Sequence, residues 1–107
     1  MNRLRLIESN YYVISAKDGR EGIEKAEKEM PDLILLDVMM PRMNGLDTLM
    51  KLKSNSKTLH IPVIMLSGAG GKEVLNKALV NGACDFIKKP FNGEMLMEVI
   101  KKNLSAG

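Results

Sequence analysis

Two short runs of consecutive apolar residues restrict the folds open to this chain more than any other feature. Leucine and isoleucine fill positions 33–36, and a second run covers positions 61–66. A strand with one face in water alternates apolar and polar residues, whereas a strand of a parallel sheet is covered on both faces and is apolar throughout. The two runs therefore predict buried strands of a parallel sheet.

Amphipathic segments separate these runs and predict helices that cover the sheet. Strands are expected at 11–16, 33–36, 61–66 and 84–87, and helices over 20–30, around 46–50, over 74–82 and after Asn92, which is suited to cap the last helix. Strands that alternate with helices predict an α/β fold with a doubly wound parallel sheet, formed by residues 1–107 as a single domain.

The first ten residues fit two different structures. Positions 3–6 alternate like a strand, whereas Leu4 and Ile7 also fit one face of a helix. The pattern leaves both open, and no buried run like 33–36 precedes residue 11.

Composition points to one small domain without a dedicated surface for nucleic acid or membrane. The chain has 107 residues, of which 45% are hydrophobic, enough for a single core. Its net charge of +3 comes from Lys and Arg spread over predicted helix faces, and no apolar stretch is long enough to span a membrane. Cys84 is the only cysteine, so no intrachain disulfide forms. We expect Cys84 to be a small core residue and the chain to work in the cytoplasm.

Polar residues follow three of the predicted strands. Asp37 comes directly after 33–36, Ser67 follows 61–66, and Lys88 and Lys89 follow 84–87. The carboxyl ends of parallel strands lie at one edge of the sheet, where ligands bind. A carboxylate that can attack, with a hydroxyl and an ammonium that can hold oxygens, suits the handling of a phosphoryl group. The ammonium would also compensate the cost of placing Asp37 beside a buried strand.

From about residue 10 to the last helix, the chain resembles the receiver domain of two-component response regulators, the family that includes the chemotaxis response regulator. Asp37 is followed by the loop Met40-Pro41-Arg42-Met43-Asn44-Gly45, which matches the Met-Pro-x-Met-x-Gly pattern of the family. Ser67 comes thirty residues after Asp37, and Lys89 another twenty-two residues on, directly before Pro90. Gly82-Ala83 matches the Gly-Ala that opens the fifth strand of the family.

The resemblance implies a flavodoxin-like fold and a role for each of these residues. Asp37 would be the phosphoacceptor, with Ser67 and Lys89 binding the phosphate. Ser67 and Phe86 would form the switch that responds to phosphorylation, although Phe86 lacks the hydroxyl of the Tyr found in some members. The peptide bond between Lys89 and Pro90 is expected to be cis, which proline makes inexpensive.

One part of the family pattern is not found. Receivers carry an acidic pair after their first strand, more than forty positions before the phosphoacceptor, and only 36 residues precede Asp37. We therefore expect the first strand and its acidic pair to be absent and residues 1–9 to be the remnant of the first helix. The Mg²⁺ that this pair shares with Asp37 and the backbone carbonyl of Met39 would bind weakly or not at all. Phosphorylation is expected to be slow or absent for that reason.

A missing strand would also leave unpaired backbone beside 33–36, since the family order is 2-1-3-4-5. Three repairs are conceivable: the strand at 11–16 lies beside 33–36, another copy lends a segment, or residues 3–8 pair somewhere new. Exposed strand edges favour association, so we expect a dimer or higher oligomer.

The resemblance implies a signalling module and not an enzyme. Its partners would be a histidine kinase or phosphotransfer protein, which supplies the phosphoryl group, and a downstream target protein. The alternative is a degenerate receiver that binds partners without phosphorylation, because the acidic pair is missing. A phosphohydrolase of the haloacid dehalogenase type would need an Asp at position 39, where this chain has Met39. A P-loop would need Gly at position 66 and Ser or Thr at position 73, where this chain has Leu66 and Glu73.

Overall fold

A mixed sheet with helices on both faces forms the domain in the computed structural model, which describes residues 2–6, 11–16, 18–37, 45–68 and 72–105. Within these ranges the sheet has five strands in the spatial order β1-β2-β3-β4-β5. They are β1 (Asn2–Leu6), β2 (Tyr11–Ala16), β3 (Leu33–Asp37), β4 (Val63–Ser67) and β5 (Asp85–Lys88). Strands β2 to β5 are parallel, and β1 is antiparallel to β2. The predicted α/β fold with a parallel sheet is confirmed.

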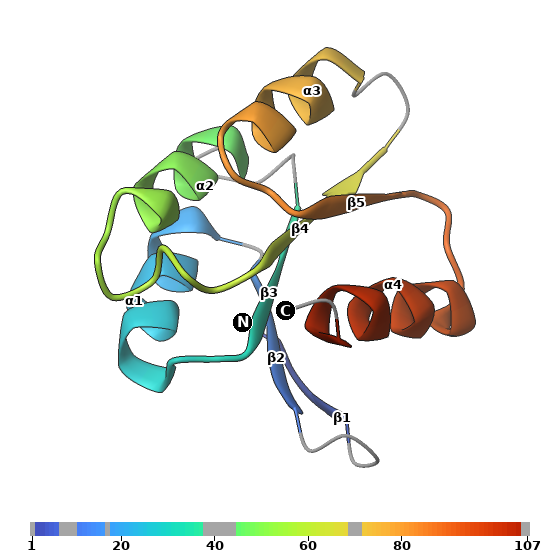
Figure 1. The fold of residues 1–107 in the computed structure, drawn as a ribbon, viewed down its shortest axis with the longest axis horizontal. Coiled ribbons are helices and arrows are strands. Elements are labelled where there is room, and N and C mark those ends of the chain that lie inside the picture. The colour runs from blue at the N-terminus through green and yellow to red at the C-terminus, as the bar shows by residue number, and fades with distance from the viewer. Residues whose placement is uncertain (1, 7–10, 17, 38–44, 69–71, 106–107) are drawn as a thin grey trace.

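The helices lie on the two faces of this sheet in unequal numbers (Figure 1). They are α1 (Gly19–Glu29), α2 (Gly45–Lys53), α3 (Lys72–Val80) and α4 (Gly93–Ser105). Helices α1, α2 and α3 cover one face, and α4 covers the other. Asn92 caps α4 as predicted, because its side-chain oxygen accepts the backbone N–H of Met95 at 2.8 Å. None of the helices, over the residues described, is long and apolar enough to cross a membrane.

The burial of β3 on both faces explains the continuous apolar run at positions 33–36. Ile34 and Leu36 join the core cluster under α1, α2 and α3, whereas Leu33 and Leu35 join the cluster under α4. Each of these four side chains is at most 2% exposed. Successive strand residues point to opposite faces, so a strand covered on both sides must be apolar at every position.

The amino-terminal end differs from the expectation. The prediction that residues 1–9 are the remnant of a helix is wrong for Asn2–Leu6, which form β1, and residues 7–10 lie outside the described part of the chain. Strand β2 lies directly beside β3, with Ala16 opposite Leu36, as in the first of the three expected repairs. Strand β1 pairs with the other edge of β2, with Leu4 opposite Val13. This pairing satisfies backbone groups that an edge strand would leave open.

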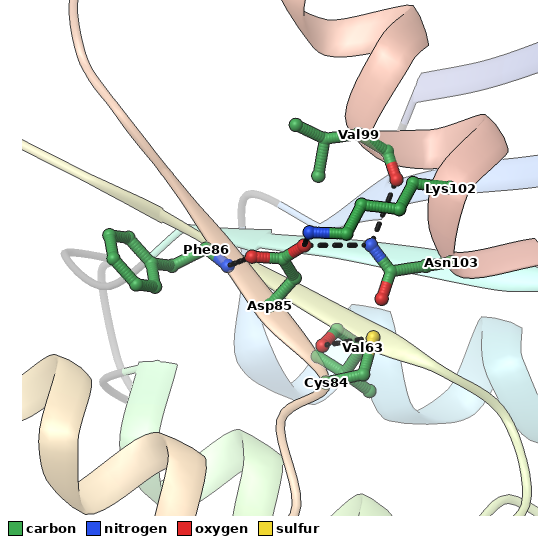
Figure 2. A network of polar contacts seen from close by, with 7 residues as sticks. All are labelled: Val63, Cys84, Asp85, Phe86, Val99, Lys102 and Asn103. Atoms are coloured by element: carbon green, nitrogen blue, oxygen red, sulfur yellow. Dashed lines mark hydrogen bonds and ion pairs between the residues drawn. The ribbon is translucent and has the colours of Figure 1, made fainter. Parts of the chain in front are cut away.

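A polar network ties the start of β5 to the end of α4 (Figure 2). The Asp85 carboxylate accepts the backbone N–H of Phe86 at 2.8 Å and the side-chain amide of Asn103 at 2.9 Å. The same amide donates to the carbonyl of Val99 at 2.8 Å, and the Lys102 ammonium lies 4.0 Å from Asp85. Helix α4 is thereby fixed against the strand that leads to Lys89.

Cys84 is not the core residue that the sequence suggested. The neighbouring Ala83 is 7% exposed and takes the buried position, while Cys84 as a residue is exposed. Its part-buried thiol donates to the carbonyl of Val63 at 3.4 Å. Partial burial raises the pKa of the Cys84 thiol, and the Asp85 carboxylate raises it further. A thiol of this kind is a poor nucleophile near neutral pH.

Helix α1 approaches β2 so closely that Gly22 has no room for a side chain. A Cβ at Gly22 would lie 2.7 Å from the Cβ of Ala16, whereas a Cβ at Gly93 would meet nothing within 4 Å. We expect Gly22→Ala to lower the free energy of unfolding by about 1–3 kcal/mol through overpacking. Gly93→Ala is the matched control and should be neutral or stabilising. Urea unfolding of both variants checks this, and equal stabilities would contradict the close contact.

The charge of Asp85 should control the reactivity of Cys84. In Asp85→Asn the pKa of the thiol falls, so alkylation by iodoacetamide at pH 8 should be roughly twofold faster or more than in the unmodified chain. Glu94→Gln is the control. It removes a negative charge from the first turn of α4, whereas Asp85 contacts the last turn through Asn103, and it should leave the alkylation rate unchanged. If both variants react at the rate of the unmodified chain, Asp85 does not act on the thiol.

Candidate functional site

Asp37 is the polar end of an otherwise buried strand. It is the last residue of β3 and lies opposite Leu66 of β4, and its side chain is 26% exposed. The carboxylate therefore opens to solvent at the carboxyl edge of the sheet, while the residues before it are in the core. This is the edge at which ligands bind in open α/β sheets.

Lys89 brings a positive charge to this carboxylate from the other side of β4. Its Nζ donates to Oδ2 of Asp37 at 2.5 Å, and its side chain is 42% exposed. The backbone N–H of Lys89 donates to the carbonyl of Ser67 at 2.6 Å, which fixes the residue beside the end of β4. The Lys89–Pro90 peptide bond is cis, in agreement with the expectation. Lys88 lies one residue earlier, at the end of β5, and is exposed.

Ser67 ends the strand between Asp37 and Lys89. Its side chain is 1% exposed, and its hydroxyl donates to the carbonyl of Gly68 at 3.0 Å. The sequence predicted that carboxylate, hydroxyl and ammonium meet at one edge. The structure brings Asp37 and Lys89 into contact and sets Ser67 at the end of the intervening strand, with its hydroxyl directed to its own loop.

Phe86 lies on β5 opposite Met65 of β4. It is half-buried and packs against the core cluster that α1, α2 and α3 cover. Its ring therefore packs on the face of the sheet that α1, α2 and α3 cover.

Sequence reasoning missed a second carboxylate at this edge. Asp18 follows β2, and β2 is the direct neighbour of β3. The Asp18 side chain caps α1 by accepting the backbone N–H groups of Arg20 and Glu21, at 3.0 and 3.5 Å. The sequence did contain a signal for this position, because Asp18 lies just after a predicted strand and directly before Gly19, where an acidic residue can cap the start of a helix.

The residues expected to hold Mg²⁺ do not form a complete set in the described part of the chain. Met39, whose backbone carbonyl was expected to bind the metal with Asp37, lies outside the described residues. Among those described, no three His, Cys, Asp or Glu side chains are grouped as a metal site would require. Asp18 is engaged in the cap of α1 and Asp37 in the contact with Lys89. These donors do not fit the several oxygen ligands that Mg²⁺ prefers.

Comparisons with known proteins identify the family to which the sequence and the fold belong. The family model for the response regulator receiver domain matches residues 2–101. Chemotaxis protein CheY of Bacillus subtilis is 34% identical, over 94% of this chain and 82% of its own length. Hybrid signal transduction histidine kinase D of Dictyostelium discoideum is 40% identical over 91% of this chain, which spans only 6% of that kinase.

A solved structure supports the same relationship. The signal receiver domain of a signal transduction histidine kinase from Syntrophus aciditrophicus superposes with a TM-score of 0.77 at 35% identity, covering 94% of this chain and 76% of that one. The fold and the sequence match over nearly the whole chain lead to one conclusion. The chain belongs to the response regulator receiver domain family.

Proposed function

We propose that this chain accepts a phosphoryl group on Asp37 in a histidine–aspartate phosphorelay. The observation that carries the proposal is the contact between Asp37 and Lys89 at the carboxyl edge of the sheet, 2.5 Å between Oδ2 and Nζ. The carboxylate is accessible, and a cation is in place to balance the charge of an incoming phosphoryl group. The family match supports phosphorelay signalling as the setting.

The transfer itself uses the carboxylate as nucleophile. An oxygen of Asp37 attacks the phosphorus of a phosphohistidine, the new O–P bond forms as the N–P bond breaks, and the imidazole nitrogen leaves with the electron pair and takes up a proton. Lys89 supports the negative oxygens of the phosphoryl group through its ammonium. For Ser67 to contribute, its hydroxyl must turn from the carbonyl of Gly68 toward the group on Asp37.

The signal would leave the domain through docking of a second protein. Ser67 and Phe86 act as the switch, and the surface formed by α3, β5 and α4 changes its partner. The donor is a histidine kinase or phosphotransfer protein, and the receiver of the signal is a downstream target protein. The chain acts in this scheme as a cytoplasmic signalling module without enzymatic activity, membrane contact or nucleic-acid binding, and copies of it associate through strand edges.

Receiver domains typically bind Mg²⁺ in an acidic pocket, and this chain would do so weakly. The described carboxylates at the edge are Asp37, in contact with Lys89, and Asp18, in the cap of α1. Because phosphoryl transfer in such sites draws on the metal for charge neutralisation, phosphorylation of Asp37 would be slow.

Incubation with acetyl phosphate and Mg²⁺, followed by intact mass spectrometry and peptide mapping, tests the assignment. We expect sub-stoichiometric gain of one phosphoryl group on Asp37 and none in Asp37→Asn, which keeps the shape but not the nucleophile. Asp47→Asn, at an exposed position of α2, is the matched control and should be modified like the unmodified chain. No modification under any condition, or modification that persists in Asp37→Asn, contradicts the phosphoacceptor role. Rapid stoichiometric modification contradicts the proposal that Mg²⁺ binds weakly and leaves the phosphoacceptor role of Asp37 in place.

A further inference from the structure

Lys88 brings a second positive charge to the carboxyl edge of the sheet. It is the last residue of β5 and is exposed, and it makes no hydrogen bond or ion pair with the residues that the structure describes. The ammonium of the next residue, Lys89, already donates to Oδ2 of Asp37. Of these two adjacent lysines, one is engaged with the proposed nucleophile and the other is available to an anion from solution.

The register of the sheet sets the distance from Lys88 to the nucleophile. Lys88 lies opposite Ser67 of β4, and Asp37 lies opposite Leu66, the residue before Ser67. Neighbouring strands are about 4.8 Å apart, so the backbone of Lys88 lies about 10 Å from that of Asp37. The Debye length is about 8 Å at physiological ionic strength and longer in dilute buffer, so an anion near Asp37 is within range of this charge.

Lys88 also shares a face of the sheet with Ser67. Phe86 and Met65 both belong to the core under α1, α2 and α3, and residues two apart in a strand point to the same face. Lys88 follows Phe86 by two positions, and Ser67 follows Met65 by two. An anion beside the Ser67 hydroxyl is therefore next to Lys88 as well.

We propose that Lys88 attracts dianionic phosphodonors to this edge and thereby raises the rate at which Asp37 is phosphorylated. The carboxylate of Asp37 repels an incoming dianion, and the Lys89 ammonium in contact with it balances only one negative charge. Lys88 acts through its charge before the phosphoryl group reaches Asp37, and the substrate class that it favours is the free acyl phosphates. The inference rests on the proposed function, because it concerns the phosphodonor of the same aspartate.

Phosphorylation rates with two donors of different charge test the proposal. Near neutral pH, acetyl phosphate is a dianion and phosphoramidate is mainly a monoanion. At an ionic strength of about 20 mM, Lys88→Gln should lower the second-order rate constant about two- to threefold for acetyl phosphate and less than about twofold for phosphoramidate. At about 500 mM both effects should nearly disappear, because salt screens the charge. Lys88→Arg keeps the charge and should react like the unmodified chain.

Lys57→Gln is the matched control for these rates. Lys57 is exposed in the segment that leads into β4, at the opposite edge of the sheet, so its loss changes the net charge equally and should leave both rate constants unchanged. An equal loss of rate in Lys57→Gln and Lys88→Gln would overturn the proposal, since net charge alone would then explain it. An equal loss for both donors would overturn it too.

A thiol probe measures the same charge without phosphorylation. Gly68 follows Ser67, and a Cβ at Gly68 would meet nothing within 4 Å, so Gly68→Cys has room for a thiol at this edge. In a chain that also carries Cys84→Ser, the rate with dianionic dithiobis(nitrobenzoate) is divided by the rate with neutral dithiodipyridine, so that the thiol pKa affects both terms. At low ionic strength, Lys88→Gln should lower this ratio about threefold, and Lys57→Gln should leave it unchanged.

The two measurements separate the inference from the proposed function. If Asp37 is never phosphorylated while Lys88→Gln lowers the thiol ratio, the proposed function falls and the attraction of dianions by Lys88 stands. If Asp37 is phosphorylated while neither the rate nor the ratio depends on Lys88, the function stands and the inference falls. A lower ratio without a loss of rate with acetyl phosphate also overturns the inference, because the phosphodonor then makes no use of the charge.

Discussion

The burial of strand β3 on both faces is the constraint on which the rest of the structure depends. Its side chains alternate between two separate cores, one under α1, α2 and α3 and one under α4. Neither face tolerates a polar group without a partner, so the strand is apolar until its last residue. Asp37 is the first residue of β3 that reaches solvent, and the same burial that excludes charge from the preceding residues of the strand holds the carboxylate in a defined place.

Parallel pairing turns this one position into a site. Strands β3, β4 and β5 end at the same edge, so Ser67 and the residues after β5 are delivered next to Asp37 without any long-range loop. The network around Asp85 holds α4 on β5 near the other end of that strand. The location of Lys89 thus depends on packing far from the carboxylate, as well as on its own contact with Asp37.

Much of this arrangement could be predicted from the residues. The apolar runs identify β3 and β4 because burial on both faces leaves a direct trace in composition, and the strand-end rule then groups Asp37, Ser67 and Lys89. Other features leave no such trace. The sequence does not specify which oxygen the Ser67 hydroxyl donates to, and in the structure it is the carbonyl of Gly68. The sequence also does not specify which of two adjacent small residues is buried, and in the structure it is Ala83 and not Cys84. The pattern at 3–6 fitted a strand as well as a helix, and only the open edge of β2 decides between them.

The contact between Asp37 and Lys89 reaches across a whole strand. It joins the end of the central strand β3 to the segment after β5, which is the outermost strand on that side, and passes over the end of β4. The ion pair therefore links the middle of the sheet to its rim. A change of charge on Asp37 would thus alter a contact that ends at the rim of the sheet and not in its middle.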